Sequence, residues 1–505
     1  MTSIRYVTAR IRTHRVLGMR VVVAGTDQCV ASMSNFAVGV AVARVAGIAA
    51  LGAYSLAYVA WLAIADVHRS LVTDPMAIDN DLSGPAAARN VRSGLAAEMA
   101  LGVGLSIAFG AVGVLLLLAG QHAYGVAFVA LAPWLTFLLA QDYWRWVGFM
   151  KASPSKALAN DVVFDVVQAL AFGLLFVVGI RSSVLAIGAW GIGALVASVF
   201  GLWQHHVTPT LRGGVGRIRH RWPMSSWLLA ASLTGWGGSQ AYVVLTGALL
   251  GPAGLGGLRA AVSLVNGPSL VILQAGGAIG LPEASRALHA RGWPGLRRVE
   301  RVITGVGLLC VGALALVVLL FGRRLLEVLY GSGFGRFAPT ADVLAIAVIV
   351  GAASTGAILS LKTTKQTGRL FRRGLVSLVV SIAAVAVLVP LFGLEGAAAS
   401  SVVRSLVLTG STLLLHWRYS RSWADAMVEP PPALPALEAS PHGAGEVIGA
   451  EVVAPGSGGA LGRTRARGVQ SPGTVVAAEA ASAPPGWHLA DAGGITGPLA
   501  GTPPA

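Results

Sequence analysis

The chain has 505 residues, of which 55% are hydrophobic and only 11% are charged, and its formal net charge is +16. Soluble domains carry about 25% charged residues. This composition excludes an ordinary soluble enzyme, a disordered hub and a nucleic-acid-binding domain. It predicts an all-α polytopic membrane protein, in which an excess of Arg and Lys is typical of cytoplasmic loops.

The amino-terminal segment 1–20 contains five arginines. It is not followed by the short apolar region and small-residue cleavage site of a removed signal peptide. We therefore expect residues 1–20 to form a basic cytoplasmic arm that is retained in the protein.

Apolar windows of about 20 residues, the length that spans the hydrocarbon of a bilayer, predict about twelve transmembrane helices. They form two sets of six, which predict an N-terminal six-helix bundle at 21–206 and a C-terminal six-helix bundle at 224–416. A basic linker rich in Pro and Gly, 207–223, lies between them. The predicted spans are 21–43, 45–66, 94–119, 123–143, 160–180, 184–206, 224–249, 255–281, 301–321, 338–361, 374–392 and 394–416.

The distribution of basic residues predicts the topology. With the amino terminus in the cytoplasm, 30 of the 37 Lys and Arg residues fall in cytoplasmic segments and 5 fall in outer segments. The positive-inside rule therefore favours an even number of spans in the cell membrane, with both termini cytoplasmic.

A short pattern recurs in the two sets of helices. Residues 47–52 and 251–256 both match G-x-x-x-L-G, and each follows the first predicted helix of its set. We interpret the pattern as a trace of a parallel internal repeat, because many transporters are built from two similar halves.

The carboxy-terminal segment has a different composition. Half of the 24 prolines lie in 429–505, among many Gly, Ala and Ser residues. Such a segment cannot bury a core, so we expect residues 417–505 to form a disordered cytoplasmic tail.

Motifs of catalysis and cofactor binding do not occur in the sequence. It has no P-loop, no H-E-x-x-H, no C-x-x-C and no G-x-S-x-G, and its two cysteines, Cys29 and Cys310, are far apart. We therefore predict that the protein is not an enzyme and has no cofactor, metal site or nucleic-acid partner.

A few ionisable or polar residues interrupt the apolar windows. An ionised side chain at the bilayer centre costs roughly 2.5–3.5 kcal/mol on insertion scales, so each one needs a reason. The candidates for a water-filled cavity are Asp27, Asn35, Arg44, Arg259 and Arg404.

A second group of charges lies near the predicted cytoplasmic ends of the helices, where a charged group can reach water. For these residues we expect structural pairing. They are Glu98, Asp142, Arg145, Asp161 and Asp165.

Several stretches resemble a known family. The run from Asp27 to Phe36, the sequence Gln141-Asp142-Tyr143-Trp144-Arg145 and Gly331 with its flanking residues are similar to polysaccharide-biosynthesis exporters. These are flippases of lipid-linked oligosaccharides, in the superfamily that also contains the multidrug and toxin extrusion (MATE) transporters and the lipid II flippases. The resemblance covers about residues 20–420.

The resemblance implies a MATE-like, V-shaped fold of two six-helix bundles around a central cavity, and alternating access. The implied substrate is a polyprenyl-diphosphate-linked glycan, which crosses from the inner to the outer leaflet. Arg44, Arg259 and Arg404 could then meet the diphosphate, because Arg binds phosphate oxygens in a fork geometry. Glycosyltransferases or a polymerase of the same pathway are the implied protein partners.

Two alternatives stay open at the level of the sequence. The first is a cation-coupled multidrug efflux transporter, which would use deep carboxylates such as Asp27. The second is a membrane scaffold of a cell-surface glycan complex that does not transport, with the Pro-rich tail as a docking arm.

Overall fold

A computed structural model describes the backbone of residues 2–79, 82, 86–151, 153–208, 210, 213–364 and 367–426. Within these ranges it describes the side chains except those of 2–31, 274–275, 278–279, 367–371 and 421–426. We call residues 32–208 the N-half and residues 213–420 the C-half.

All regular elements of the described backbone are helices. Those of the N-half and its amino-terminal extension are α1 (Thr2–His68), the π-helical turn η1 (Arg69–Thr73), α2 (Asp74–Ile78), α3 (Ala87–Leu118), α4 (His122–Leu131), η2 (Ala132–Trp134), α5 (Leu135–Met150), α6 (Pro154–Val177) and α7 (Ser183–His205). Those of the C-half are α8 (Gly214–Tyr330), η3 (Ser332–Phe337), α9 (Ala338–Ala352), α10 (Thr355–Thr363) and α11 (Thr367–Ala426).

Nine helical stretches of the described chain are long and apolar enough to cross a membrane. Backbone outside helical geometry at Gly47, Gly251, Gly292 and Gly393 divides four of these stretches. Two predicted spans cover more than one element, since 123–143 includes α4, η2 and the start of α5, and 338–361 includes α9 and most of α10. The prediction of an all-helical polytopic protein is confirmed.

The segments form helical hairpins whose connections turn at a glycine. A glycine with positive φ, a region that side chains with a Cβ rarely adopt, lies within or at most three residues from each of the six predicted outer connections. These glycines are Gly47, Gly120, Gly179, Gly251, Gly331 and Gly393. We call this end of the helices the turn end and the opposite one the basic end.

The two glycine turns predicted from the repeated pattern are equivalent. Gly47 has φ 85° and ψ −176°, and Gly251 has φ 70° and ψ −175°. A Cβ on Gly52 would lie 1.8 Å from the Pro252 carbonyl oxygen, and a Cβ on Gly256 would lie 2.0 Å from that of Ile48. The hairpins thus contact each other reciprocally, and both halves need glycine there for close backbone approach.

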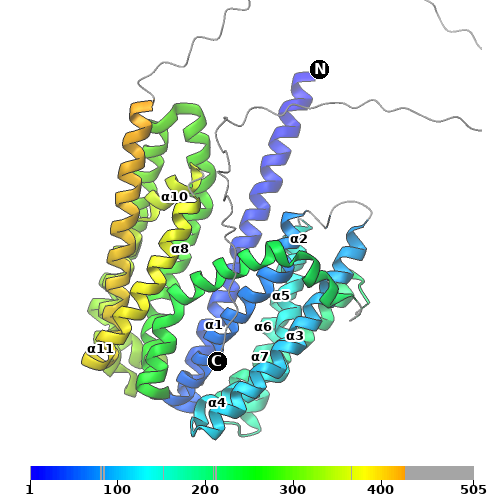
Figure 1. Ribbon diagram of the computed structural model, residues 1–505, viewed down its shortest axis with the longest axis vertical. Coiled ribbons are helices and arrows are strands. Elements are labelled where there is room, and N and C mark those ends of the chain that lie inside the picture. The colour runs from blue at the N-terminus through cyan, green and yellow to red at the C-terminus, as the bar shows by residue number, and fades with distance from the viewer. Residues whose placement is uncertain are drawn as a thin grey trace, which may run out of the picture. The chain divides into compact units, whose positions relative to one another are not determined.

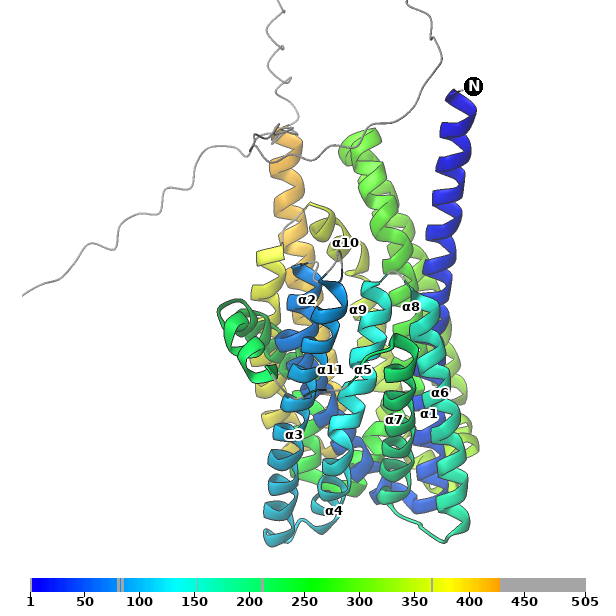
Figure 2. The same ribbon diagram turned by 90° about the vertical axis from the view of Figure 1, so that its right-hand side faces the viewer.

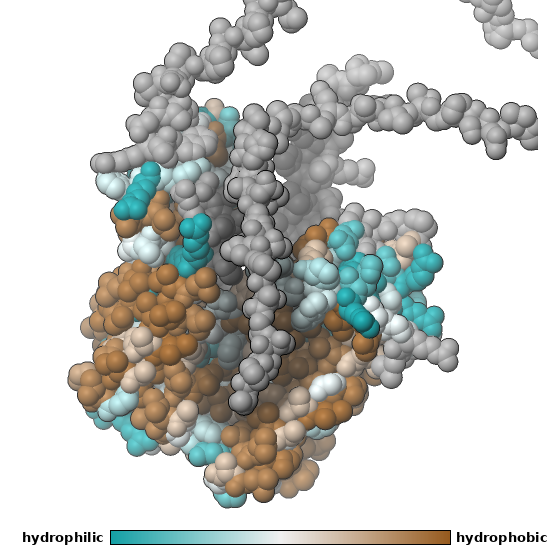
Figure 3. Space-filling view, viewed as in Figure 1, coloured by the Kyte–Doolittle hydropathy of each residue, from teal (hydrophilic) through white to brown (hydrophobic). Residues whose placement is uncertain are grey.

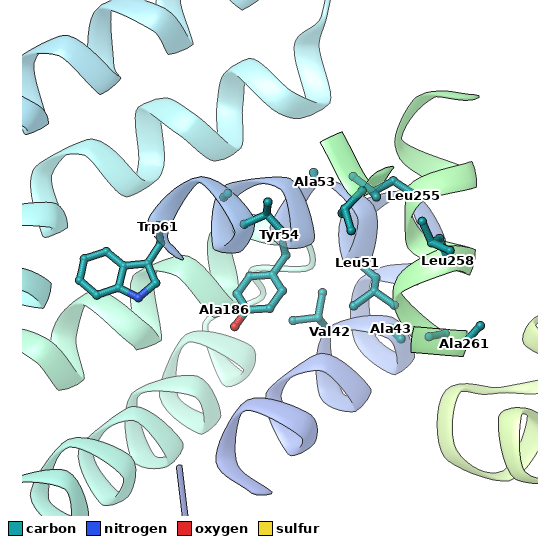
Figure 4. Packing of buried hydrophobic residues seen from close by; sticks show 14 of the residues in the cluster. Val42, Ala43, Leu51, Ala53, Tyr54, Trp61, Ala186, Leu255, Leu258 and Ala261 are labelled. Atoms are coloured by element: carbon teal, nitrogen blue, oxygen red, sulfur yellow. The ribbon is translucent and has the colours of Figure 1, made fainter. Parts of the chain in front are cut away.

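Apolar packing supports this contact. Figure 4 shows Val42, Leu51 and Tyr54 of α1 near Leu255 and Leu258 of α8, and all five side chains are fully or almost fully buried. Between helices in a bilayer, van der Waals packing and close approach at small residues favour contacts of this kind. The largest core cluster therefore joins the N-half to the C-half at the turn end.

Each half also packs within itself. Contacts link α3 with α4 and α5, and α6 with α7, while α8 contacts α9, α10 and α11. Figures 1 and 2 show α3, α5, α6 and α7 running alongside one another, with α11 next to later segments of α8.

Large apolar side chains cover much of the outer surface of the helices. Leu118, Val177, Leu309 and Val379 are between 66% and 80% exposed. Figure 3 shows hydrophobic residues over most of the described face that it displays. A soluble protein rarely exposes so large an apolar area, and this surface fits the acyl chains of a bilayer.

Some helices extend beyond the predicted spans. The backbone of α1 is helical from Thr2, within the predicted arm 1–20. Likewise α8 begins at Gly214, within the predicted linker 207–223, and α11 continues to Ala426, past the predicted end at residue 416. Hydropathy windows detect only the part of a helix that can lie in hydrocarbon, so they miss polar extensions. The rest of the predicted tail lies outside the described residues.

Candidate functional site

A cavity of about 440 Å³ lies between the two halves. We call it the central cavity. Side chains of α1, α5, α6 and α7 form one wall, and Arg259, Ser263 and Asn266 of α8 contribute the other. Its polar lining distinguishes it from the apolar surface that faces lipid.

Two further cavities adjoin it along the C-half. The second cavity, of about 380 Å³, shares Arg259 and Asn266 with the central cavity. The third, of about 730 Å³, shares Arg404 and Ser405 with the second. Because neighbouring cavities share lining residues, the polar surface continues from the N-half wall to Arg404 and beyond.

The charges of the N-half wall are paired. Arg69 Nε and Nη2 donate to the two carboxylate oxygens of Asp142 at 3.2 and 3.3 Å. Arg145 Nε lies 3.0 Å from Asp161 Oδ2, and the Gln141 amide donates to Asp161 Oδ1 at 2.7 Å. The structural pairing predicted for Asp142, Arg145 and Asp161 is therefore present.

The C-half cavities have a different charge balance. Arg259, Lys362, Arg373 and Arg404 line them, and no Asp or Glu occurs among their described lining residues. Arg404 Nε and Arg373 Nε are buried and have no hydrogen-bond partner in the described part of the chain. Arg373 also experiences the repulsive charge of Arg404. These cavities are thus positively charged.

Aromatic and hydroxyl groups accompany these cations. The Arg259 guanidinium lies over the Tyr58 ring, 4.8 Å from its centroid, which is a favourable cation–π distance. The Ser401 hydroxyl of the second cavity is buried and has no hydrogen-bond partner among the described residues. The site therefore presents unsatisfied donors to an anion.

The structure places three of the five candidate site residues in this cavity system. Asn35 and Arg259 line the central cavity, and Arg259 and Arg404 line the second one. Arg44 is exposed and lies elsewhere, because its guanidinium donates to the carbonyl oxygens of Val328 and Leu329 near the end of α8. The Asp27 side chain lies outside the described residues.

Sequence reasoning did not single out Arg373, Lys362 or Tyr58. Lys362 and Arg373 flank a predicted cytoplasmic loop, where basic residues are expected for topology alone. Tyr58 lies in an apolar window as an ordinary aromatic residue. Only the tertiary arrangement places these side chains on the walls of the cavities.

Solved structures with the same fold are transporters and flippases. A multidrug resistance MATE-family transporter of the MOP superfamily, in an inward-facing conformation, matches with a TM-score of 0.59 and 16% identity, over 79% of this chain and 95% of that one. Lipid II flippase MurJ, in an inward closed conformation, matches with a TM-score of 0.57 and 12% identity, over 78% of this chain and 87% of that one. No protein-family model and no curated protein matches the sequence.

A third match is a MOP superfamily transporter from Pyrococcus furiosus that has a binding pocket of reverse polarity. It has a TM-score of 0.51 and 14% identity, and the match covers 81% of this chain and 96% of that one. At these identities the matches show the fold alone. The chain thus has the fold of MOP superfamily transporters, which confirms the predicted MATE-like architecture.

Proposed function

We propose that the protein is a flippase of the cell membrane that moves a lipid-linked oligosaccharide or polysaccharide precursor by alternating access, with both termini in the cytoplasm. The observation that carries this proposal is the cationic surface formed by Arg259, Arg404, Arg373 and Lys362, without a carboxylate among its described lining residues. A diphosphate supplies the missing negative charge, and Arg can bind its oxygens through two parallel hydrogen bonds.

The contrast between the two halves supports an anionic substrate over a cationic drug. A cationic substrate needs accessible carboxylates, but two of the three carboxylates that line the central cavity, Asp142 and Asp161, are paired with Arg69 and Arg145, and Asp165 is the third. A scaffold would need neither the polar cavities nor an arginine such as Arg404, whose Nε is buried without a hydrogen-bond partner among the described residues. In a glycan pathway the protein partners would be glycosyltransferases or a polymerase.

The test uses purified protein in liposomes that contain a fluorescent polyprenyl-diphosphate disaccharide. A membrane-impermeant reductant bleaches dye only in the outer leaflet, so flipping makes the inner-leaflet dye accessible. We expect Arg404→Ala to slow flipping at least tenfold, which corresponds to about 1.4 kcal/mol or more. Arg404→Lys should recover little, because a point charge lacks the fork of Arg.

Arg324→Ala is the matched control, because it removes an exposed guanidinium at the turn end. Its flipping rate should equal that of the wild type. A wild-type protein that does not flip the diphosphate lipid but lowers the accumulation of a cationic dye would support multidrug efflux instead. If the protein is inactive in both assays but co-purifies with a glycan-synthesis enzyme, the result would support the scaffold hypothesis.

A further inference from the structure

A buried imidazole lies between two carboxylates behind the N-half wall of the central cavity. His68 ends α1, and its Nδ1 contacts Glu98 Oε2 of α3, while its Nε2 lies 3.3 Å from Asp142 Oδ2 of α5. The side chains of His68 and Glu98 are 0% exposed, and that of Asp142 is 7% exposed. We call His68, Glu98, Asp142 and Arg69 the histidine cluster.

The imidazole lies between two carboxylates, with a hydrogen bond from Nδ1 to Glu98, whereas Nε2 is at ion-pair distance from Asp142 without hydrogen-bond geometry. A neutral imidazole has one N–H, so it can donate to only one of the two carboxylates. Both contacts are favourable when the imidazole is doubly protonated, or when Glu98 is protonated and donates to Nδ1. In either form the charges of the cluster sum to zero, because Arg69 balances Asp142.

Loss of one proton changes this balance. The cluster then carries a net negative charge, and a nitrogen lone pair faces a carboxylate in a site without solvent. Glu98 Oε1 already has no hydrogen-bond partner among the described residues, so it offers no compensation. An unpaired buried charge is strongly disfavoured, and the cluster must rearrange when it loses the proton.

The cluster is connected to the transport site on one side. Asp142 and Arg69 belong both to the cluster and to the lining of the central cavity. The Arg69 guanidinium also lies 5.5 Å from the centroid of the Trp146 ring, which positions it at that wall. A rearrangement of Asp142 therefore changes the cavity surface directly.

The histidine cluster also adjoins the C-half, through the turn η1 and its contact with α8. The π-helical turn η1 follows His68 directly, and such turns often occur at functional sites. Ser70 of this turn hydrogen-bonds to Ser232 of α8 at 3.0 Å. A displacement of His68 would thus reach the interface between the N-half and the C-half.

We propose that the histidine cluster is a proton-binding site whose occupancy shifts the equilibrium between the conformations of the two halves. This inference takes only the identity of the transported substrate from the proposed function. A ligand shifts such an equilibrium when it binds one conformation better than the other, and the described packing accommodates the protonated cluster.

Other charged groups surround the histidine and belong to the same electrostatic unit. Asp66 Oδ1 lies 3.9 Å from Arg69 Nη1, and Asp74 of α2 interacts electrostatically with His68. Arg145 repels Arg69 from α5. From α8, the uncharged Ser232 hydrogen-bonds to Ser70 of η1. The test must therefore separate His68 from these carboxylates.

The experiment measures the distance between spin labels on the two halves without any substrate. The labels are attached to Ala88→Cys and Ala290→Cys, both exposed at the basic end, in a Cys29→Ser, Cys310→Ser background. We titrate the reconstituted protein from about pH 5 to about pH 10, which covers the ordinary range of histidine. The ratio of the population with the long distance to the population with the short distance should change at least fivefold over this range.

His68→Gln should reduce this change to less than twofold. Glu98→Gln should do the same and keep the distances of the low-pH state, because an amide can donate to Nδ1 as a protonated carboxyl does. His416→Gln is the matched control: His416 Nε2 contacts Glu300 Oε1 at 3.0 Å, but its Nδ1 has no partner among the described residues. This variant should retain the wild-type response.

The proposal is overturned if the wild type shows no pH response, if His68→Gln retains it, or if His416→Gln loses it equally. Should His68→Gln fail to fold, Glu98→Gln decides, because an undiminished pH response in that variant also overturns the proposal. No lipid-linked substrate is present in this experiment. A protein that responds to pH but fails to flip the diphosphate lipid would therefore refute the proposed cargo and leave the proton site intact.

Discussion

The two halves treat their buried charges differently. In the N-half, Arg69 and Arg145 pair with Asp142 and Asp161 across helices α5, α6 and the turn η1. In the C-half, Arg404 and Arg373 line cavities without a carboxylate among the described lining residues. One half therefore satisfies its charges internally, and the other leaves cations for an external ligand.

This difference suggests separate tasks for halves that share one architecture. The backbone turns at Gly47 and Gly251 are equivalent. The side chains diverge at the cavities, where a paired network suits proton-dependent rearrangement and an unpaired cationic surface suits anion binding. In this arrangement a proton would bind to the N-half and a diphosphate would bind to the C-half of the same transporter.

The strongest way to test the comparison is to remove one charge from each half. Asp161→Ala removes the carboxylate that Arg145 and Gln141 contact, and breaking a buried pair costs about 3–5 kcal/mol. Arg404→Ala removes a charge that has no carboxylate partner, so the free energy of unfolding should stay within about 1 kcal/mol of the wild type. Unfolding by titration with a denaturing detergent measures both values.

Equal losses in the two variants would make Arg404 a structural residue. The double variant Arg145→Met, Asp161→Leu provides a control for the N-half. Because it removes both charges and keeps the apolar volume, it should recover most of the stability that Asp161→Ala loses.

A smaller effect is expected where the halves are alike. Gly52→Ala and Gly256→Ala would each place a Cβ within 2.0 Å of a carbonyl oxygen of the facing hairpin. Such overpacking costs about 1–3 kcal/mol, and the two losses should agree because the contacts are reciprocal. Gly104→Ala is the control in α3, since nothing lies within 4 Å of the position that its Cβ would take. Unequal losses would argue against the equivalence of the hairpins.

Adding a carboxylate to the C-half should make it resemble the N-half. Ser405 lines the second and third cavities together with Arg404. Ser405→Asp should pair with that guanidinium and weaken binding of a polyprenyl-diphosphate lipid about tenfold, or about 1.4 kcal/mol. Ser405→Asn tests the change in shape alone and should bind nearly as the wild type does. Equal affinities for all three proteins would exclude the second cavity as the diphosphate site.

The sequence predicted the fold better than the site. Apolar windows identify segments that can enter hydrocarbon, and the repeated glycine pattern marked two equivalent turns. Arg259 and Arg404 were found because a charge inside an apolar window is costly. His68 was missed because it lies at the end of a window, and its partner Glu98 is 30 residues away on another helix. Such pairing depends on helix packing, which hydropathy does not encode.

The smallest expected effect concerns Arg44, the candidate that the structure places outside the described cavity linings. Its guanidinium donates to the carbonyl oxygens of Val328 and Leu329 near the carboxy-terminal end of α8. A cation at a helix carboxy terminus typically contributes about 0.3–1 kcal/mol. Arg44→Ala should therefore lower the free energy of unfolding by that amount and leave the flipping rate of the diphosphate lipid unchanged. Arg44→Lys should restore part of the stability, because the charge near the helix end remains. If instead Arg44→Ala slows flipping as much as Arg404→Ala does, Arg44 must meet the substrate in a second conformation, and the division between a paired half and a cationic half would have to include the turn end.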